Sequence, residues 1–326
     1  MPKSIIIKKN GGPEVLEISD VKIDKPGPKE IKIQNIAVGL NYIDTYHRSG
    51  LYPLKLPSGI GLEGAGVVLE VGSEVNNFNK GDNIAYAATP LGSYSEERNI
   101  PEKIAVKIPK GVSHKVAASI MTKGLTTYYL LNKTYKVNSR DTVLFHAAAG
   151  GVGQIFTQWA KSIGCRLIGT VGSDDKIDVA KKNGCDFVIN YKKDSFDKKV
   201  LEITKNKGLG VVYDGVGKET FEKSINCLKP RGMMVSFGNS SGMLNPIDVK
   251  KHMAPKSLFF TRPALTNYVS ERSELEESAA SLFDAIKFGK VKIKIFKEYA
   301  LSDVRKAHED LEARKIIGPA LLVPNE

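Results

Sequence analysis

The first 120 or so residues alternate short apolar runs of β-strand character with turns rich in glycine and proline. Five such runs precede the first helical pattern, at residues 4–21, 30–41, 64–75, 80–87 and 103–109. Short apolar runs between turn signals are typical of an irregular, mostly-β domain.

The spacing of apolar residues lengthens over residues 113–135. A helix is predicted there, capped by Ser113 and ending near Gly124, with a second helix following it.

From Thr142 onward, apolar strands alternate with segments long enough for helices. The strands are expected at residues 142–146, 166–171, 186–190, 210–214, 232–237 and 257–261. Parallel strands need such crossover connections, so this pattern predicts a doubly wound parallel sheet. After residue 262 come two helical stretches, 273–289 and 302–314, and an apolar segment, 319–324, all expected to pack back onto the first domain.

Composition supports a two-domain globular protein. The chain has 326 residues, of which 41% are hydrophobic and 26% charged, enough for substantial cores. Its N-terminal apolar run holds only three isoleucines, and no stretch approaches the roughly 18 apolar residues of a membrane span. A cytoplasmic location without membrane contact is predicted.

Net charge and cysteine content limit the kinds of ligand and of cysteine site that the chain can have. The excess of 48 Lys and Arg over 36 Asp and Glu gives a net charge of +12, which favours anionic ligands. The lysines are spread along the whole chain, so a solvated surface is favoured over a nucleic-acid interface. The three cysteines, Cys165, Cys185 and Cys227, are too few and too scattered for a disulfide framework or metal clip, and are expected to be small core residues.

A glycine-rich turn, "HAAAGGVGQ", joins the strand at 142–146 to a helix. It is a partial GxGxxG match, because Ala148 stands at the first glycine position while Gly150 and Gly153 keep the others. The helix carries one apolar stripe, formed by Val152, Ile155, Phe156, Trp159, Ala160 and Ile163. In this context a pyrophosphate can approach the backbone and bind the N–H groups at the helix N-terminus, which predicts a dinucleotide site.

The end of the second strand decides between NADH and NADPH. An NAD site usually places a carboxylate there for the ribose 2′-hydroxyl, but this chain has Gly172 and Ser173, with Lys176 close behind. These residues suit a 2′-phosphate and therefore NADPH. Asp174 and Asp175 argue the other way, and we expect both to point into solvent.

Across nearly its whole length the sequence resembles the quinone oxidoreductases, the zeta-crystallin-like branch of the zinc-free medium-chain dehydrogenases/reductases. The resemblance rests on the ordered motifs "NYIDTYHRSGLYP", "GLEGAGVVLEVGSEVNNFNKGDNIAY", "KGLTTYYLL", "HAAAGGVGQ", "VINY", "VVYDGVG", "MVSFGNSSG" and "FFTRP". It implies an α/β fold in which a Rossmann NADPH domain (124–262) lies between two parts of a GroES-like catalytic domain (1–123 and 263–326), with the active site in the cleft. It also implies a homodimer, for which the strand "SLFFT" is a candidate edge.

The resemblance carries over a set of site residues. Asn41 and Tyr46 match contacts near the nicotinamide, and Asn41, Tyr46 and Tyr52 are the catalytic candidates, in a segment expected to be a loop after a strand. The remaining NADPH positions are Gly150, Gly151, Val152, Gly153, Gly172, Ser173, Lys176, Tyr191, Phe237, Gly238, Asn239, Ser240 and Arg314. Core packing is the alternative for Tyr46, Tyr191 and Phe237.

Zinc ligands are missing from the positions where zinc alcohol dehydrogenases of the superfamily carry them. Asn41 stands in place of a cysteine and Leu62 in place of a histidine, and there is no four-cysteine loop. No metal is therefore predicted. Without a Lewis acid, reduction of a conjugated acceptor fits best, since hydrogen bonds alone can stabilise its delocalised oxyanion.

The function predicted is thus an NADPH-dependent quinone oxidoreductase. Two alternatives stay open: an NADPH-dependent reductase of alkenal or enone double bonds, and an RNA-binding role known from some family members. The sequence does not decide the physiological acceptor, the proton donor or whether one or two electrons are transferred.

Overall fold

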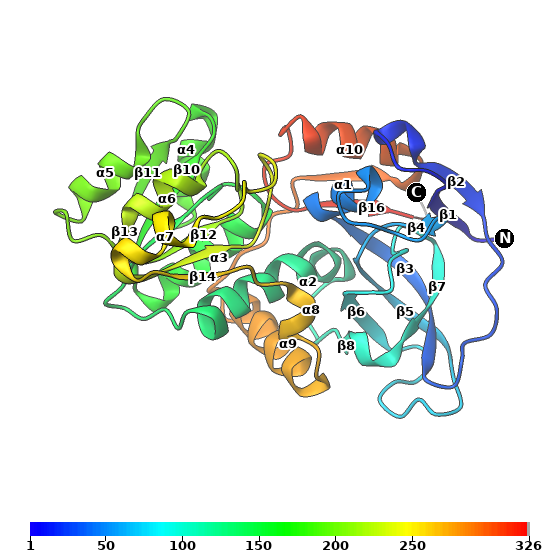
Figure 1. Ribbon diagram of the computed structural model, residues 1–326. Coiled ribbons are helices and arrows are strands. Elements are labelled where there is room, and N and C mark those ends of the chain that lie inside the picture. Colours follow the sequence, from blue (N-terminus) through cyan, green and yellow to red (C-terminus); the bar gives the residue numbers. More distant parts are fainter. Residues whose placement is uncertain (325–326) are drawn as a thin grey trace. The chain divides into compact units, whose positions relative to one another are not determined.

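The structure, a computed structural model, describes residues 1–324, which form two compact units. Unit 1 comprises residues 1–125 and 268–287 together with the chain from residue 293 onward, and unit 2 comprises residues 126–267 and 288–292. Both ends of the chain thus belong to unit 1 (Figure 1). Within residues 1–324, no helix is both long and apolar enough to cross a lipid bilayer.

Unit 1 contains two β-sheets. The small sheet has the order β2-β1-β4, formed by Glu17–Asp20, Lys3–Ile7 and Ser58–Gly59. The larger, seven-stranded sheet has the order β15-β16-β3-β5-β6-β8, with β7 also paired to β3. Its strands are β15 (Lys297–Ala300), β16 (Ala320–Val323), β3 (Glu30–Leu40), β5 (Glu63–Val71), β6 (Asn83–Ala87), β8 (Ala105–Lys107) and β7 (Glu97–Pro101).

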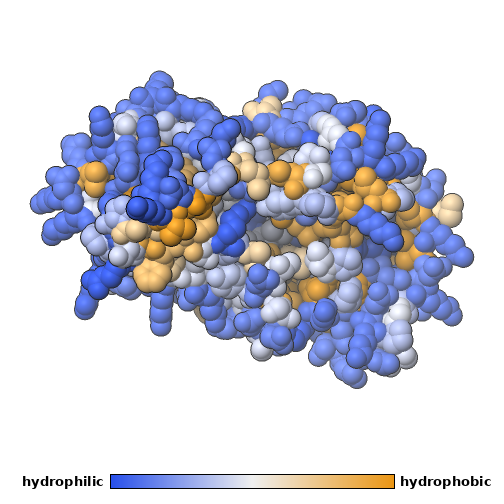
Figure 2. Space-filling view, in the orientation of Figure 1, coloured by the Kyte–Doolittle hydropathy of each residue, from blue (hydrophilic) through white to orange (hydrophobic). Residues whose placement is uncertain are grey.

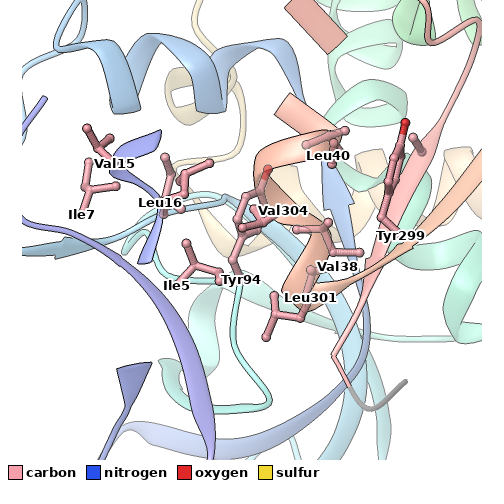
Figure 3. Close-up of a cluster of buried hydrophobic side chains, with 14 residues drawn as sticks. Ile5, Ile7, Val15, Leu16, Val38, Leu40, Tyr94, Tyr299, Leu301 and Val304 are labelled. Carbon is pink, nitrogen blue, oxygen red and sulfur yellow. The ribbon is translucent and has the colours of Figure 1, made fainter. Parts of the chain in front are cut away.

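Pairing of β16 with β3 joins the end of the chain to its beginning. The two strands are antiparallel, with Ala320 opposite Leu40. A buried apolar cluster lies beside this pairing and draws Ile5 and Ile7 from β1, Val38 and Leu40 from β3, and Leu301 and Val304 from the C-terminal segment (Figure 3). In the structure, β16 thus pairs with a strand of the first part of the chain.

Unit 2 is built on a six-stranded parallel sheet with the order β11-β10-β9-β12-β13-β14. The strands are β9 (Thr142–Phe145), β10 (Arg166–Val171), β11 (Phe187–Asn190), β12 (Leu209–Asp214), β13 (Leu228–Ser236) and β14 (Phe259–Thr261). Renumbered from β9, this is the 3-2-1-4-5-6 order of a Rossmann fold, so the predicted doubly wound sheet is confirmed.

Helices cover both faces of this sheet because side chains alternate along each strand. Phe145 stacks on Phe156 of α3 (Gly151–Ile163), with ring centroids 4.2 Å apart. Its neighbour Leu144 packs with α5 (Phe196–Ile203) and α6 (Phe221–Cys227). The remaining helices of the chain are α1 (Tyr42–Ser49), α2 (His114–Tyr129), α4 (Ile177–Lys182), α7 (Val249–His252), α8 (Leu265–Tyr268), α9 (Arg272–Lys287) and α10 (Val304–Glu312).

Two sequence-based expectations about local structure are wrong. Helix α2 does not end near Gly124 but continues to Tyr129 and into a π-helical turn, η3 (Leu130–Thr134). Gly124 instead makes room for a neighbour, since a Cβ added there would lie 2.4 Å from Leu282 Cδ2 of α9. Residues 42–49, expected to be a loop, form α1. The predicted Ser113 cap is confirmed, because its hydroxyl accepts from Val116 N at 3.2 Å.

Candidate functional site

The glycine turn lies between β9 and α3, as expected. Gly150 is the N-cap residue of α3 and is extended; as a glycine it has no side chain that could cap the first N–H groups of the helix. Gly153 lets α3 approach the chain leaving β9, because a Cβ there would lie 2.4 Å from Ala147 O. Uncapped N–H groups and the helix dipole together favour an anion at this position.

The end of β10 brings three of the candidate residues close together. A Cβ on Gly172 would lie 3.1 Å from the Tyr191 hydroxyl, so the tyrosine lies over a glycine that leaves it room. Ser173 follows in extended conformation and precedes a short 3-10 turn, η4 (Asp174–Lys176). Tyr191 also packs against the apolar core of unit 2. Its ring thus contributes to the core while its hydroxyl lies over Gly172.

The carboxylate of Asp174 is neutralised within unit 2. Asp174 and Asp175 are both exposed, as expected. However, Asp174 also accepts from Asn190 Nδ2 at 2.6 Å and forms an ion pair with Lys193. These two partners lower the pKa of Asp174, the lysine most. The sequence therefore overstated the repulsion that a 2′-phosphate would meet here.

The remaining candidates of unit 2 follow β13. Phe237 N donates to Asp214 O at 2.8 Å, and its ring lies 5.5 Å from that of Phe145. Gly238 is in close contact with the turn after β12, since a Cβ there would lie 2.5 Å from Gly215 O. Asn239 and Ser240 continue this loop, with Asn239 buried.

All these segments leave the carboxyl ends of parallel strands and so meet at one edge of the sheet. That edge offers a helix N-terminus whose N-cap residue is a glycine, two glycines where a Cβ would clash, and a serine and lysine in place of an unpaired carboxylate. These features fit a dinucleotide with a 2′-phosphate.

In unit 1, Asn41 lies between β3 and α1 and is only 6% exposed. Its backbone N–H donates to the Asp44 carboxylate at 2.9 Å, so Asp44 fixes the start of the helix. Helix α1 then presents Tyr46 half-exposed rather than in the core.

Three tyrosines gather around α1. The ring of Tyr46 makes edge contacts with Tyr42 at 5.5 Å and with Tyr52 at 5.3 Å between centroids. Burial raises the pKa of Tyr42, and the charge of Arg314, which follows α10, partly offsets that effect. Unit 1 therefore brings Tyr42, Tyr46 and Tyr52 into contact, and the charge of Arg314 acts on Tyr42.

A buried charged cluster adjoins Asn41. The Glu63 carboxylate accepts from Asn41 Nδ2 at 2.7 Å, from Lys123 Nζ at 2.9 Å and from Thr122 N at 2.5 Å. Glu63 is fully buried and Lys123 is 5% exposed. We call Asn41, Glu63, Thr122 and Lys123 the Glu63 cluster.

A second buried polar chain connects α1 with α10. Arg48 lies 3.0 Å from His308 Nδ1, and His308 Nε2 lies 3.3 Å from the hydroxyl of Tyr94. Because arginine only donates, Nδ1 must accept and Nε2 carries the proton. Burial, reinforced by the Arg48 charge, lowers the pKa of His308 to about 3.

The chain ends at Asp44, whose carboxylate accepts from the Tyr94 hydroxyl at 2.7 Å. Burial raises the pKa of Asp44 to about 7, against the opposing effect of the hydrogen bonds from Tyr94 and Asn41.

Sequence reasoning missed Lys123, Asp44 and Lys193. A capping signal was present in the spacing of Asn41 and Asp44, three residues apart. For Lys123 and Lys193 no local signal exists, because their partners are 60 and 19 residues away. The three cysteines are buried and unbonded to one another, as expected.

For metal, the described residues include no group of three or more His, Cys, Asp or Glu side chains that could hold an ion. The family resemblance implies that Asn41 and Leu62 stand where related zinc enzymes carry ligands, and neither is a usual zinc ligand. The zinc-free expectation stays a prediction.

Comparison with known proteins agrees with this architecture. Residues 27–110 match the family model of the alcohol dehydrogenase GroES-like domain, and residues 151–284 that of the zinc-binding dehydrogenases. A quinone oxidoreductase of Pseudomonas aeruginosa is 47% identical over 99% of this chain and 100% of its own length. A 2-haloacrylate reductase of Burkholderia is 42% identical over 99% of each chain.

Among solved structures, the quinone oxidoreductase of Escherichia coli complexed with NADPH has a TM-score of 0.97. It is 46% identical, with 99% of this chain and 100% of that one covered. Identity at this level over 99% of this chain shows that the protein belongs to the quinone oxidoreductase family of the medium-chain dehydrogenases/reductases.

Proposed function

We propose that this protein is an NADPH-dependent quinone oxidoreductase that works without a metal ion. The observation that carries the proposal is the carboxyl edge of the parallel sheet, where a glycine turn opens α3 and the neighbouring strand β10 is followed directly by Gly172 and Ser173. Relatives named quinone oxidoreductases, one of them solved with NADPH, support it.

The proposed cofactor contacts divide between the two units. In unit 2, backbone N–H groups of Gly150 to Gly153 bind the pyrophosphate, with Val152 among them. Ser173, Lys176 and Tyr191 bind the adenosine and its 2′-phosphate beside Gly172, and residues 237–240 border the same edge. In unit 1, taken by itself, Asn41, Tyr46 and Arg314 are the proposed contacts, and the catalytic role is proposed for this GroES-like part of the chain.

Bound NADPH supplies the reducing equivalents, and the protein orients the acceptor and stabilises its developing negative charge. Tyr46 and Tyr52 are the proposed hydroxyl donors, because α1 and its tyrosine cluster leave both half-exposed. At neutral pH a tyrosine hydroxyl donates hydrogen bonds well and protons poorly, so solvent delivers the final proton.

Steady-state oxidation of NADPH and of NADH against a panel of quinones and enones tests the function. We expect quinone-dependent oxidation with NADPH preferred, and unchanged rates after treatment with a chelator. Failure of every quinone would refute the proposal. One zinc per chain by elemental analysis, with activity lost on its removal, would refute the metal-free part.

Reduction of a conjugated carbon–carbon double bond is the second candidate. The relative named 2-haloacrylate reductase favours it, since a haloacrylate is an unsaturated acid of this type. The same panel decides, because an enone turned over faster than every quinone would reverse the order of the two proposals.

We also propose that the protein is a homodimer that pairs through β14. This strand is the outer edge of the parallel sheet, and its Phe259 is 58% exposed. Val249 and Met243, also exposed, belong to neighbouring segments, and Figure 2 shows apolar surface over this part of unit 2. An exposed edge strand with apolar side chains favours pairing with a second copy.

Light scattering tests this assembly. The wild type is expected to be a dimer and Phe259→Lys a monomer, while Phe296→Lys, at an exposed phenylalanine of unit 1, stays dimeric.

We propose in addition that the protein is located in the cytoplasm. RNA binding is tested by gel shifts over a salt series, with no salt-resistant complex expected.

A further inference from the structure

A buried carboxylate lies at the carboxyl edge of the parallel sheet in unit 2. Asp214 is the last residue of β12 and is fully buried. Its Oδ1 accepts from Val216 N at 2.7 Å and from Gly217 N at 3.0 Å, and its Oδ2 accepts from the Thr220 hydroxyl at 2.7 Å. Taking a carboxylate out of water is costly unless such donors replace the water. The proposed chemistry gives Asp214 no role, but its bonds to the following turn indicate one.

These bonds set the direction of two peptide planes after β12. In a trans peptide the N–H and the C=O point in opposite directions. The N–H groups of Val216 and Gly217 point at the Asp214 carboxylate. The carbonyl groups of the same two peptides, those of Gly215 and Val216, therefore point away from it. The carboxylate thus determines which way both carbonyl oxygens face.

Both carbonyl oxygens hold the loop that follows β13. Gly215 O accepts from Ser240 N at 3.3 Å. Val216 O accepts from Ser241 N and from the Ser241 hydroxyl, in each case at 2.8 Å. The turn after β12 is therefore the support on which this second loop rests.

The start of the second loop is tied to Asp214 itself. Phe237 N donates to the backbone oxygen of Asp214 at 2.8 Å, and Gly238 N donates to the same oxygen at 3.3 Å. The two loops approach closely here, because a Cβ added to Gly238 would lie 2.5 Å from Gly215 O. Asp214 thus holds residues 237–241 in two ways, through its own carbonyl oxygen and through the peptides that its carboxylate orients.

The strand order indicates which half of the cofactor this loop serves. A dinucleotide binds across the point where the strand order of a Rossmann sheet reverses, here between β9 and β12. The proposed sites for the pyrophosphate and the 2′-phosphate follow β9 and β10. The nicotinamide half therefore extends over the ends of β12 and β13, where residues 237–241 lie.

We infer that Asp214 is a positioning residue: through the turn at 215–217 it holds residues 237–241 in the conformation that receives the nicotinamide half of NADPH. The inference rests on the proposed function and adds a residue that is not itself a cofactor contact. A loop already held in its binding conformation does not have to be ordered when the ligand binds, which raises affinity. Without the carboxylate, the two peptides are free to turn and the loop loses its acceptors.

Removing the carboxylate should weaken the binding of one half of the cofactor only. Asp214→Ala is expected to raise the dissociation constant for NADPH about tenfold or more. Adenosine 2′,5′-bisphosphate carries the adenosine and the 2′-phosphate but no nicotinamide, so its dissociation constant should equal that of the wild type. A residue that only stabilised the fold would change both values or neither. Isothermal titration calorimetry without any acceptor measures both ligands.

Asp214→Asn is the conservative variant. Its amide keeps an oxygen for the N–H groups of Val216 and Gly217, and the Thr220 hydroxyl has a second acceptor in Gly217 O, 3.2 Å away. The dissociation constant for NADPH should therefore stay within about threefold of the wild-type value. A loss as large as that of Asp214→Ala would overturn the inference, because the oxygen that orients the two peptides is still present.

Asp141→Ala is the matched control. The Asp141 carboxylate also accepts from a backbone N–H, that of Asn138 at 2.9 Å, and from a hydroxyl, that of Tyr135 at 3.1 Å. However, Asp141 directly precedes β9 and so lies at the opposite, amino edge of the same sheet. Both dissociation constants should be unchanged. Lys176→Ala is the converse variant and should weaken both ligands, since both carry the 2′-phosphate.

Equal losses of affinity for NADPH and the bisphosphate in Asp214→Ala would overturn the inference, and so would wild-type affinity for NADPH. If thermal unfolding shows that Asp214→Ala does not fold, Ser241→Ala decides, because it removes the hydroxyl that joins Val216 O to Glu219 N. A loss of about threefold or more for NADPH alone supports the inference, and an equal loss or none overturns it. Failure of the proposed function is recognised separately, as a wild type that binds NADPH but reduces no acceptor.

Discussion

At the scale of single residues, Lys176 is predicted to decide between NADPH and NADH. One charge-assisted hydrogen bond to a 2′-phosphate contributes roughly 1.5–3 kcal/mol, so Lys176→Ala should raise the dissociation constant for NADPH about ten- to a hundred-fold. The value for NADH should barely change. Fluorescence titration with both cofactors measures this.

The matched control is Lys161→Ala. Lys161 pairs with Asp186 near the C-terminus of α3, at the far end of that helix from the glycine turn. Lys161→Ala should leave the dissociation constants for NADPH and for NADH unchanged. Equal losses of NADPH and NADH affinity in Lys176→Ala would show that Lys176 does not recognise the phosphate.

Tyr46→Phe is predicted to slow turnover more than it weakens NADPH binding, because only the hydroxyl is lost and the ring keeps its contacts with Tyr42 and Tyr52. Loss of one donor to an oxyanion costs about 2.7–4 kcal/mol where the charge is concentrated on one oxygen. A quinone spreads this charge, so we expect about 1–2 kcal/mol, near a tenfold fall in kcat/KM. Steady-state kinetics with a quinone measures it.

Tyr135→Phe is the comparison for Tyr46→Phe, since it removes a structural hydrogen bond to Asp141 in unit 2. Its kcat/KM should equal that of the wild type. Unchanged turnover in a folded Tyr46→Phe protein would remove Tyr46 from the catalytic residues.

At the scale of secondary structure, the sequence predicted the parallel sheet well because each of its strands is a short apolar run between turn signals. Helix α3 was predictable for a similar reason, since its stripe residues Ile155, Phe156, Trp159 and Ala160 are all buried. In both cases the signal is local.

The mispredicted end of α2, unlike the missed start of α1, depends on a contact between residues distant in the chain. Gly124 has the appearance of a helix end, but it serves the approach of Leu282, which lies 158 residues later in the chain (282 minus 124). The Glu63 cluster likewise joins β3, β5 and α2, and no spacing along the sequence indicates that Lys123 meets Glu63.

Helix α2 gives a prediction of its own. Alanine normally stabilises a helix interior relative to glycine by about 1 kcal/mol, yet Gly124→Ala should destabilise the protein by about 1–3 kcal/mol. The reason is the fully buried side chain of Leu282, whose methyl carbons lie 2.4 and 2.5 Å from the added Cβ.

Urea unfolding of Gly124→Ala, Leu282→Ala and the double variant measures this effect. The double variant should be more stable than the sum of the two single losses predicts, because Leu282→Ala removes the clash. Strict additivity, or a stabilised Gly124→Ala, would contradict the packing explanation.

At the scale of the whole molecule, unit 1 joins chain segments from both ends, and a buried polar chain accompanies that connection. Arg48, on α1, donates to Glu312 at 2.7 Å and contacts His308 on α10, while Tyr94 links His308 to Asp44. Folding shifts the pKa values of His308 and Asp44 in opposite directions. The free energy of unfolding of unit 1 therefore contains two opposing contributions that depend on pH.

The signs follow from proton binding in the folded and unfolded states. The pKa of His308 falls from 6.5 to about 3 on folding, so the unfolded state binds more protons and stability is lost as the pH falls through this range. The pKa of Asp44 rises from 3.8 to about 7, so the folded state binds more protons and stability is lost as the pH rises through that range. Between about pH 4 and 6.5 the two contributions oppose each other and nearly cancel.

Asp44→Asn should therefore expose the contribution of His308. The asparagine keeps an oxygen for the hydrogen bonds from Tyr94 and Asn41 but no longer titrates. Between about pH 4 and 6.5 the free energy of unfolding of this variant should rise with pH relative to wild type, by up to about 1.4 kcal/mol per pH unit, the value for one proton. Urea unfolding of both proteins across this range measures the difference, in which all other titrating groups cancel. Parallel pH profiles for the two proteins would show that Asp44 keeps an ordinary pKa in the folded state and does not contribute to the pH dependence of stability.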